Sequence, residues 1–561
     1  MSEPHSAGLR LQPDAARYTL PRFLDDVAER FGPRVALRFE ERDTSYAALQ
    51  SEARRVAAGL AARGVGKGTR VAVLFANRPE WLFATFGASL TGAVVVPVNT
   101  FATPDELDYI LRHSDAAWLL LQANLLRHAF LDDLLARHPE IASGRPGRIR
   151  CEALPQLRSV VAFGAERARG AVEPWSALDA ADGVSPALLD AISAEIHPAD
   201  DALVIYTSGT TARPKGVVHR HRAPVIQAWR FAELMGFGPD ERVLTAYPFF
   251  WTAGIAMAIG ATLAAGGRLI VQEVFEPGAA LAAAERERAT SVQAWPHQAK
   301  AMVEHPDAAR RDLTHVRKIE FGSPLGKLAR LEQDEWGIYA SYGLSETFTL
   351  ATALPADAPA SRRKGSNGPA LPGMTVRIVD PHGGGALPAG AKGEIALKGL
   401  TLMAGYAKVE PELFLDADGF FHTQDGGTLD GEGILRWTGR LSNLIKTGGA
   451  NVSPLELEER AGRFPGVRSA HAVGVPHPTL GEAIVLCVVP TAGASVDVAG
   501  LEAFLREALS AYKLPRATFL LGADEVSYTG SQKVQVEPLR ERALARLAEA
   551  GAVIAGYTYR R

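Results

Sequence analysis

Short apolar runs that alternate with amphipathic stretches constrain the fold of this chain most strongly. Residues 70–75, 93–98 and 116–121 read as buried strands. Helical patterns lie between them, over residues 80–90 and from Thr103 onwards. Strands that are separated in this way by helices predict a parallel sheet whose faces the helices cover. The sequence therefore predicts an α/β fold for the amino-terminal part of the chain.

The same alternation continues towards the carboxyl terminus. Further apolar runs at residues 202–206, 267–271 and 317–321 are predicted strands. The stretches 365–388 and 426–433 are rich in turn residues, with short β segments between them. These stretches indicate a small β subdomain that follows the large helix-covered sheets.

A new α+β pattern begins at Ser453. Ser453, Pro454 and Glu456 have the spacing of a helix cap, a first helical residue and the third residue of a capping box. Two apolar strand-like runs and another helix follow. This part predicts a smaller α+β carboxy-terminal domain. Residues 1–15 and the tail after Gly551 are expected to be poorly ordered.

Composition excludes several classes of protein. A formal net charge of −3 over 561 residues argues against a nucleic-acid binder, which must neutralise many phosphates. The two cysteines, Cys151 and Cys487, are too few for a disulfide framework and fit a reducing compartment. No signal peptide is recognisable, and no apolar run is long enough for a membrane span. We therefore expect a cytoplasmic, multi-domain protein.

The strongest chemical signal is the segment 206–216, which reads YTSGTTARPKG and follows a predicted strand. Its glycines let backbone N–H groups approach anionic oxygens, and its hydroxyls and Lys215 supply further donors. It therefore resembles a phosphate-binding loop. It is not the common nucleotide loop, because Pro214 precedes Lys215 and Gly216 follows it.

This loop resembles the signature of the adenylate-forming superfamily, which includes acyl-CoA synthetases, luciferases and peptide-synthetase adenylation domains. The resemblance implies an ATP-dependent carboxylate–CoA ligase that forms an acyl-adenylate and then a thioester, with ATP, Mg²⁺ and coenzyme A. It also implies that the loop closes over the ATP phosphates, and that Thr207 has a catalytic role. The loop residues implied to bind ATP are Thr207, Ser208, Gly209, Thr210, Thr211 and Lys215.

Further family segments follow in the expected order. SYGLSET at 341–347 resembles the segment in which Tyr342 stacks on adenine and Glu346 holds magnesium, the hard cation that carboxylate oxygen suits. Asp425 matches the position that binds the ribose hydroxyls, and Arg440 is implied to contact ribose or phosphate. The remaining residues implied to lie around the nucleotide are Gly322, Ser323, Pro324, Gly343 and Ser345.

The resemblance also implies two orientations of the smaller domain. The implied domains are residues 1–439 and 443–561, with a hinge at 440–442 that contains Ser442. In one orientation Lys533 serves adenylation, since its ammonium stabilises the approach of two anions. In the other, Gly448 and Gly449 border the path of the coenzyme A thiol. Ser442, Asn443 and Gln532 depart from the family pattern, which motivates the alternative of a relative that does not adenylate.

The acid itself is less constrained. The segments YPFFWTAG at 247–254 and QAWPHQ at 293–298 resemble walls of the acyl pocket, with Trp251, Gly254, Trp295 and His297 as candidates. Large indole rings fill volume and offer flat apolar faces, which favours a ring-containing or medium-length apolar acid. The small-molecule acid, a carrier protein as alternative acceptor and a homodimer are left open.

Overall fold

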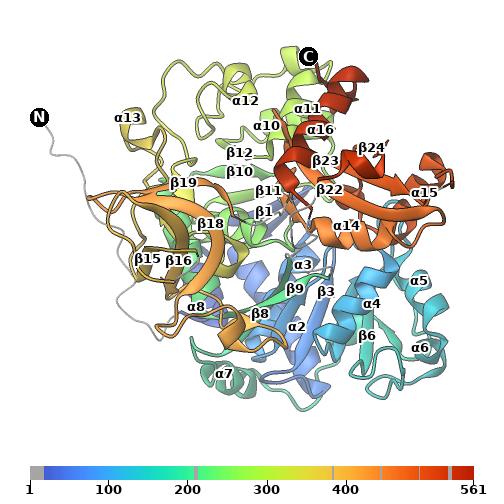
Figure 1. Ribbon diagram of the computed structural model, residues 1–561. Coiled ribbons are helices and arrows are strands. Elements are labelled where there is room, and N and C mark those ends of the chain that lie inside the picture. The colour runs from blue at the N-terminus through green and yellow to red at the C-terminus, as the bar shows by residue number, and fades with distance from the viewer. Residues whose placement is uncertain are drawn as a thin grey trace, which may run out of the picture.

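The computed structural model describes residues 18–207, 213–381, 384–441, 445–491, 493–527 and 534–560. Over these residues the chain forms a large unit of two helix-covered sheets, a small antiparallel sheet and a carboxy-terminal α+β unit (Figure 1). The predicted fold class is confirmed. No helix among these residues is long and apolar enough to cross a membrane.

An eight-stranded sheet, in the order β17-β9-β8-β4-β3-β5-β6-β7, forms the centre of the large unit. The predicted parallel pairing is confirmed for the strands from β8 to β7. Strand β9 turns back antiparallel to β8, and β17 pairs antiparallel with β9. The bounds are β3 (Arg70–Leu74), β4 (Val94–Pro97), β5 (Trp118–Gln122), β6 (Ser159–Phe163), β7 (Val172–Pro174), β8 (Asp201–Thr207), β9 (Lys215–Arg220) and β17 (Gly405–Tyr406).

A second sheet has five strands in the order β12-β10-β11-β1-β2. Its strands are β1 (Val35–Phe39), β2 (Arg42–Ser45), β10 (Arg242–Thr245), β11 (Arg268–Val271) and β12 (Ser291–Gln293). The predicted strand at residues 317–321 is wrong, because only Lys318 forms a bridge, with Ser291. Strand β12, the neighbour of this segment, is three residues long, and the chain turns at Gly322. A longer strand at residues 317–321 would therefore have no strand to pair with.

The helices and sheets of the large unit enclose three apolar clusters. The largest apolar cluster lies between the sheets and includes the fully buried α3, which packs with α2 and α1. A second cluster covers the outer face of the eight-stranded sheet, and a third lies under α10–α12. The helices of the large unit are α1 (Leu20–Phe31), α2 (Tyr46–Ala62), α3 (Pro79–Leu90), α4 (Pro104–His113), α5 (Phe130–Arg137), α6 (Pro139–Ser143), α7 (Pro186–Ala194), α8 (Arg222–Leu234), α9 (Ala261–Ala265), α10 (Pro277–Arg286), α11 (Pro296–Glu304), α12 (Pro324–Leu328) and α13 (Ala360–Arg363).

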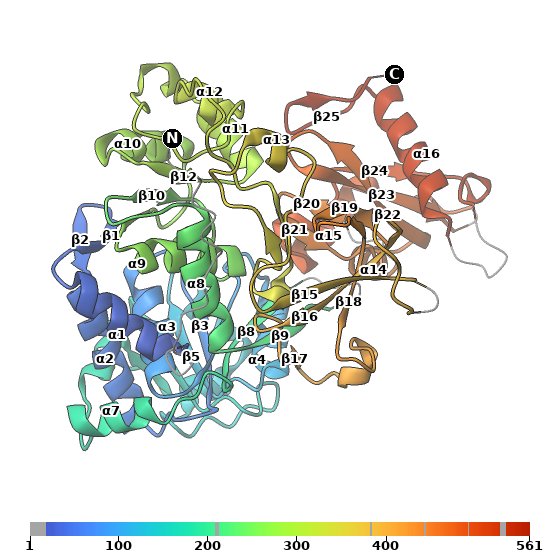
Figure 2. The ribbon, with the colours of Figure 1, turned by 90° about the vertical axis from the view of Figure 1, so that its left-hand side faces the viewer.

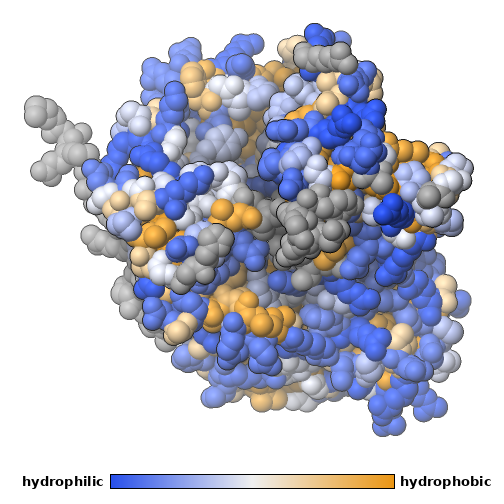
Figure 3. Space-filling model, viewed as in Figure 1, coloured by the Kyte–Doolittle hydropathy of each residue, from blue (hydrophilic) through white to orange (hydrophobic). Residues whose placement is uncertain are grey.

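The turn-rich segments form the predicted small β subdomain. Its four antiparallel strands are β15 (Met374–Val379), β16 (Lys392–Gly399), β18 (Phe421–Leu429) and β19 (Leu435–Arg440). Figure 2 shows this sheet between the large unit and the carboxy-terminal unit. On the face of the molecule in Figure 3, hydrophilic side chains predominate and apolar ones form separate small patches.

The carboxy-terminal unit has its own sheet and core. Its elements are β20 (Ile445–Thr447), β21 (Ala450–Val452), α14 (Pro454–Ala461), β22 (Val467–His477), β23 (Gly481–Pro490), α15 (Val498–Ala508), β24 (Ala517–Leu520) and α16 (Val536–Glu549). The predicted capping box at Ser453 is wrong. The Ser453 hydroxyl makes no cap hydrogen bond, and the Glu456 carboxylate accepts from Lys513.

The chain after Gly551 is ordered, contrary to the expectation from the sequence. It forms a short hairpin of β25 (Val553–Ile554) and β26 (Tyr557–Thr558). The His477 ring bonds to the Ile554 carbonyl, and the Tyr559 hydroxyl donates to the Pro476 carbonyl. These bonds and buried apolar contacts attach the tail to β22. Residues 1–15 lie outside the described residues.

Candidate functional site

A cavity of about 510 Å³ lies where the large unit, the β subdomain and the carboxy-terminal unit meet. Its polar end is lined by residues that come from all three parts. Tyr342 and Gly343 follow the five-stranded sheet in the chain, Asp425 comes from β18, and Lys446 comes from β20. Three segments that are far apart in the sequence therefore share one site.

Tyr342 and Asp425 form the centre of the polar end. Tyr342 lies in the two-residue strand β13 (Ser341–Tyr342), and its hydroxyl donates a 2.7 Å hydrogen bond to Asp425 Oδ2. Asp425 is only 2% exposed, and its backbone is in register with that of Arg440 in β19. The Asn367 amide donates to the Ser341 carbonyl and holds β13 in place. The predicted adenine and ribose residues are thus neighbours.

Thr207, Lys215 and Glu346 gather at a second corner of the site. Thr207 and Lys215 are paired residues at the loop end of the β8–β9 hairpin. The Lys215 ammonium lies 4.9 Å from the centre of the Tyr406 ring. The Tyr406 hydroxyl in turn donates a 2.6 Å hydrogen bond to Glu346 Oε1. A lysine and an oriented carboxylate next to a phosphate-loop segment suit a phosphate chain with its magnesium ion.

Two buried polar side chains hold the Glu346 segment. The ring of His219 is fully buried and bonds through Nε2 to the Ser345 carbonyl at 2.8 Å. Burial lowers the pKa of His219 to about 3, so its ring is neutral and donates this bond. The Gln227 amide donates to the carbonyls of Thr347 and Leu350. The sequence analysis missed both roles, because no local motif signals a partner more than 100 residues away.

The other end of the cavity is apolar. Phe231, Leu234 and Met235 reach it from the end of α8, Met257 from the π-helix η3 (Gly254–Gly260), and Trp295 from the residue before α11. Gly254 begins the π-helix, and a Cβ there would lie 2.0 Å from the Pro248 carbonyl oxygen. Glycine is therefore required at this position by packing.

Trp251 and His297 do not line this cavity. The Trp251 ring packs edge-on against Tyr512 of the carboxy-terminal unit, with 6.4 Å between ring centres. His297 faces the turn at Gly448, where an added Cβ would lie 3.6 Å from the ring. Both predicted pocket residues thus contact the smaller unit in this orientation.

The Gly448–Gly449 turn lies against Trp295. Both glycines have positive φ angles, +56° and +84°, which favour glycine. A Cβ on Gly449 would lie 3.0 Å from three atoms of the Trp295 ring. The buried Trp295 Nε1 and His297 Nδ1 have no hydrogen-bond partner among the described residues. Polar atoms of a ligand between the two units would satisfy them, as the amides of a coenzyme A arm can.

Gly322, Ser323 and Pro324 do not line the cavity but are linked to it through Glu320. Ser323 caps α12, accepting from the Gly326 N–H, and its hydroxyl donates to the Glu320 carbonyl. The Glu320 carboxylate accepts from the backbone of Tyr339, which lines the cavity. Six predicted site residues lie outside the described residues: Ser208, Gly209, Thr210, Thr211, Ser442 and Lys533.

Comparison with protein families agrees with this geometry. The model of AMP-binding enzymes matches residues 24–407, and the model of the AMP-binding enzyme C-terminal domain matches residues 456–533. The chain belongs to the AMP-binding enzyme family. This AMP-binding enzyme is an AMP-forming acid–thiol ligase, an ATP-dependent carboxylate–CoA ligase that uses ATP, Mg²⁺ and coenzyme A.

Known relatives cover nearly the whole AMP-binding enzyme. The feruloyl-CoA synthase of Amycolatopsis sp is 33% identical over 502 residues, with 89% of this chain and 94% of that protein covered. The indoleacetate–CoA ligase of Aromatoleum aromaticum is 31% identical over 517 residues, which cover 91% and 95%. The solved structure of the amide bond synthetase McbA from Marinactinospora thermotolerans is 28% identical with a TM-score of 0.75, covering 93% and 99%.

Proposed function

We propose that this ligase carries out two half-reactions in one cleft, and that its smaller unit changes orientation between them. In the first, a carboxylate oxygen of the acid attacks the α-phosphorus of ATP and pyrophosphate leaves. In the second, the sulfur of coenzyme A attacks the acyl carbon and AMP leaves. The observation that carries the proposal is the contact of the Gly448–Gly449 turn with Trp295, which brings the smaller unit to the acyl end of the cavity.

The polar end of the cavity is assigned to the nucleotide. Tyr342 contacts adenine and Asp425 accepts from the ribose hydroxyls, a role that its buried position beside the Tyr342 hydroxyl supports. Thr207 and Lys215 bind the phosphates, together with the loop residues that follow Thr207. Glu346 holds the magnesium ion, which neutralises phosphate charge when it is bound. Tyr406 keeps the Glu346 carboxylate turned towards Lys215.

The boundaries between the units follow from the elements. Strand β19 ends at Arg440 and β20 begins at Ile445, so residues 440–442 are the proposed hinge between units 1–439 and 443–561. In the other orientation, Lys533 enters the cleft for adenylation. We expect Lys533→Ala to slow pyrophosphate release about a hundredfold or more, as the loss of one oriented electrostatic donor does. Thioester formation from premade acyl-adenylate should be largely spared, and an equal loss in both steps would contradict two orientations.

The acid is a ring-containing or medium-length apolar acid. Phe231, Leu234, Met235, Met257 and Trp295 provide an apolar wall, and flat aromatic surfaces favour planar groups. Two similar relatives, a feruloyl-CoA synthase and an indoleacetate–CoA ligase, are named for ring-containing acyl groups, which supports this choice.

Met257→Trp tests the acid assignment. The larger side chain should fill the cavity, because Met257 lines it, and should slow ring-containing acids more than short aliphatic ones. Trp251→Ala is the control, since that side chain lies outside the cavity and should leave the ranking of acids unchanged. If Trp251→Ala changed the ranking of acids and Met257→Trp did not, the assignment of the acyl wall would be wrong.

The whole reaction is tested by mass spectrometry of the purified protein with ATP, magnesium, coenzyme A and a panel of aliphatic, aromatic and alicyclic acids. Acyl-CoA and AMP are expected from the ring-containing members. Acyl-adenylate without acyl-CoA would assign the thiol to a different acceptor, such as a carrier protein. A cytoplasmic location is proposed because both cysteines are free and buried, and a homodimer stays a prediction.

A further inference from the structure

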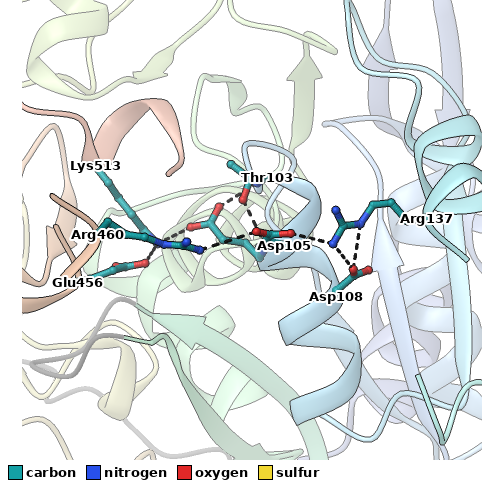
Figure 4. A network of polar contacts seen from close by, with 8 residues as sticks. Thr103, Asp105, Asp108, Arg137, Glu456, Arg460 and Lys513 are labelled. Atoms are coloured by element: carbon teal, nitrogen blue, oxygen red, sulfur yellow. Dashed lines mark hydrogen bonds and ion pairs between the residues drawn. The ribbon is translucent and has the colours of Figure 1, made fainter. Parts of the chain in front are cut away.

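Lys513 is buried between two carboxylates that belong to different units. It ends the short helix η7 (Ala511–Lys513) of the carboxy-terminal unit. Its ammonium lies 2.5 Å from Glu106 Oε1 on α4 and 2.8 Å from Glu456 Oε1 on α14. The Lys513 side chain is only 2% exposed. Figure 4 shows Lys513, Glu456 and Arg460 reaching towards the amino-terminal end of α4.

Glu106 is held in place for this contact. It is the third residue of α4 and completes a capping box, in which its Oε2 accepts from the Thr103 N–H at 2.9 Å. The Ser510 hydroxyl of the smaller unit also donates to Oε2. Both carboxylate oxygens are therefore used, one by Lys513 and the other by the cap and Ser510. A carboxylate fixed in this way presents its charge to Lys513 without having to order a free side chain.

Further contacts join the same two surfaces. Arg460 of α14 lies 3.8 Å from Asp105, the neighbour of Glu106. Tyr512, the neighbour of Lys513, packs against Trp251. The Lys300 ammonium donates to the Ala555 carbonyl on the other side of the interface. The smaller unit is thus held by contacts along one face while its Gly448–Gly449 turn lies at Trp295.

A rotation of the smaller unit would affect the two ion pairs of Lys513 differently. Glu456 belongs to the same unit as Lys513 and moves with it, so that ion pair survives any rotation. Glu106 belongs to the large unit and faces Lys513 only in this orientation. In this orientation the Lys513 ammonium is buried and needs the Glu106 carboxylate, whereas a rotation away from α4 would return it to water beside Glu456. Loss of the Glu106 charge therefore destabilises this orientation alone.

We propose that the Lys513–Glu106 ion pair is a latch that holds the smaller unit in the orientation that forms the thioester. Glu106 and Lys513 are positioning residues, since neither lines the cavity. The inference rests on the two-step function proposed above. It adds that the balance between the half-reactions is set by a contact outside the cleft.

Glu106→Gln is the decisive variant. Glutamine at the third helical position still completes a capping box, so α4 keeps its cap while the charge opposite Lys513 disappears. We expect thioester formation from premade acyl-adenylate to fall about tenfold or more, by analogy with the loss of one partner of a buried ion pair. Pyrophosphate release in the absence of coenzyme A should be unchanged or faster, because the adenylating orientation no longer competes with the latch.

Asp108→Asn is the matched control. Asp108 lies on the same helix, and its carboxylate bonds to Arg137 and His138 within the large unit. The substitution therefore removes a charge from α4 that has no hydrogen bond or ion pair to the smaller unit, although Arg137 also binds Asp105. It should change the two half-reactions equally, if at all. A merely structural role for Glu106 would produce the same pattern, with equal losses in both steps, and that result would overturn the latch.

The orientation is also measured without catalysis. Spin labels on the exposed Asp133 of α5 and Glu507 of α15 report the distance between the units by pulsed electron resonance, since both native cysteines are buried. We expect one main distance for the chain with Glu106 and a second population for Glu106→Gln. Identical distributions would overturn the latch whether or not the protein makes acyl-CoA. Absence of acyl-CoA together with a shifted distribution would reject the proposed function alone.

Discussion

Replacing Gly449 with alanine should separate the two half-reactions. Gly449 has φ +84°, and alanine in this left-handed region costs about 1–2 kcal/mol. The added Cβ would also lie 3.0 Å from three atoms of the Trp295 ring, well inside the about 3.5–4.0 Å at which carbon atoms attract. Such overpacking costs about 1–3 kcal/mol. Only this second cost depends on the orientation of the smaller unit, because the ring belongs to the large unit.

The clash should therefore lower the population of the thioester-forming orientation by about 5- to 150-fold, since about 1.4 kcal/mol is a factor of ten. Thioester formation from premade acyl-adenylate, followed by rapid quench and mass spectrometry, should fall by that factor. Pyrophosphate release without coenzyme A should change little, because the turn is expected to leave Trp295 in the adenylating orientation.

Gly448→Ala is the control for backbone strain. Gly448 also has a positive φ, +56°, but its added Cβ would lie 3.6 Å from His297 and 4.0 Å from Leu480, which are ordinary van der Waals contacts. It should therefore cause a much smaller loss of thioester formation than Gly449→Ala. Equal effects of the two variants, or a loss of adenylation in Gly449→Ala, would refute the argument that the turn and Trp295 define the thioester-forming orientation.

Two further predictions concern the phosphate corner. Tyr406→Phe keeps the ring beside Lys215 but removes the hydrogen bond to Glu346. A hydrogen bond to a metal-binding carboxylate raises the affinity for the metal, so its loss should raise the magnesium concentration that half-saturates pyrophosphate release about tenfold or more. An unchanged concentration would contradict the assignment of Glu346 as the magnesium ligand. His219 has a pKa lowered to about 3 by burial, against an ordinary value of about 6.5, so its contribution to stability is complete above pH 6.5 and lost as the pH falls below it. Lowering the pH from 7.5 to 5 should cost about 2 kcal/mol through this group, and in His219→Gln the loss measured by urea unfolding should be smaller by that amount.

The family segments could be recognised from the sequence because each is local. The loop from Tyr206 to Gly216, the 341–347 segment and Asp425 each carry donors or acceptors at fixed spacing. The structure brings Tyr342 to Asp425 and Thr207 to Lys215 as those assignments require. The parallel sheet was predictable for the same reason, since its apolar runs and helical patterns lie within short windows.

The predictions that proved wrong share one cause: contacts with residues far away in the sequence outweighed the local pattern. Ser453 and Glu456 have the spacing of a capping box, but Glu456 makes a stronger bond to a buried ammonium 57 residues away. Residues 317–321 have the composition of a strand, but the edge beside them offers one bridging residue. The tail after Gly551 was expected to lack order, but Ile554 and Tyr559 are buried and backbone carbonyls of the tail bond to His477 and Lys300.

The sequence by itself determined the fold class and the reaction class and supplied the proposed nucleotide-binding residues, because these depend on patterns within a few residues of one another. Only the tertiary structure decided which side chains line the cavity, what holds Glu346, and how the smaller unit contacts the large one. Trp251 illustrates the difference: its segment indicates a pocket wall, but the structure turns the ring to Tyr512 at the interface. Contacts between units depend on their relative placement, which no local pattern encodes. The pairing of Lys513 with Glu106, separated by 407 residues, could be found only there.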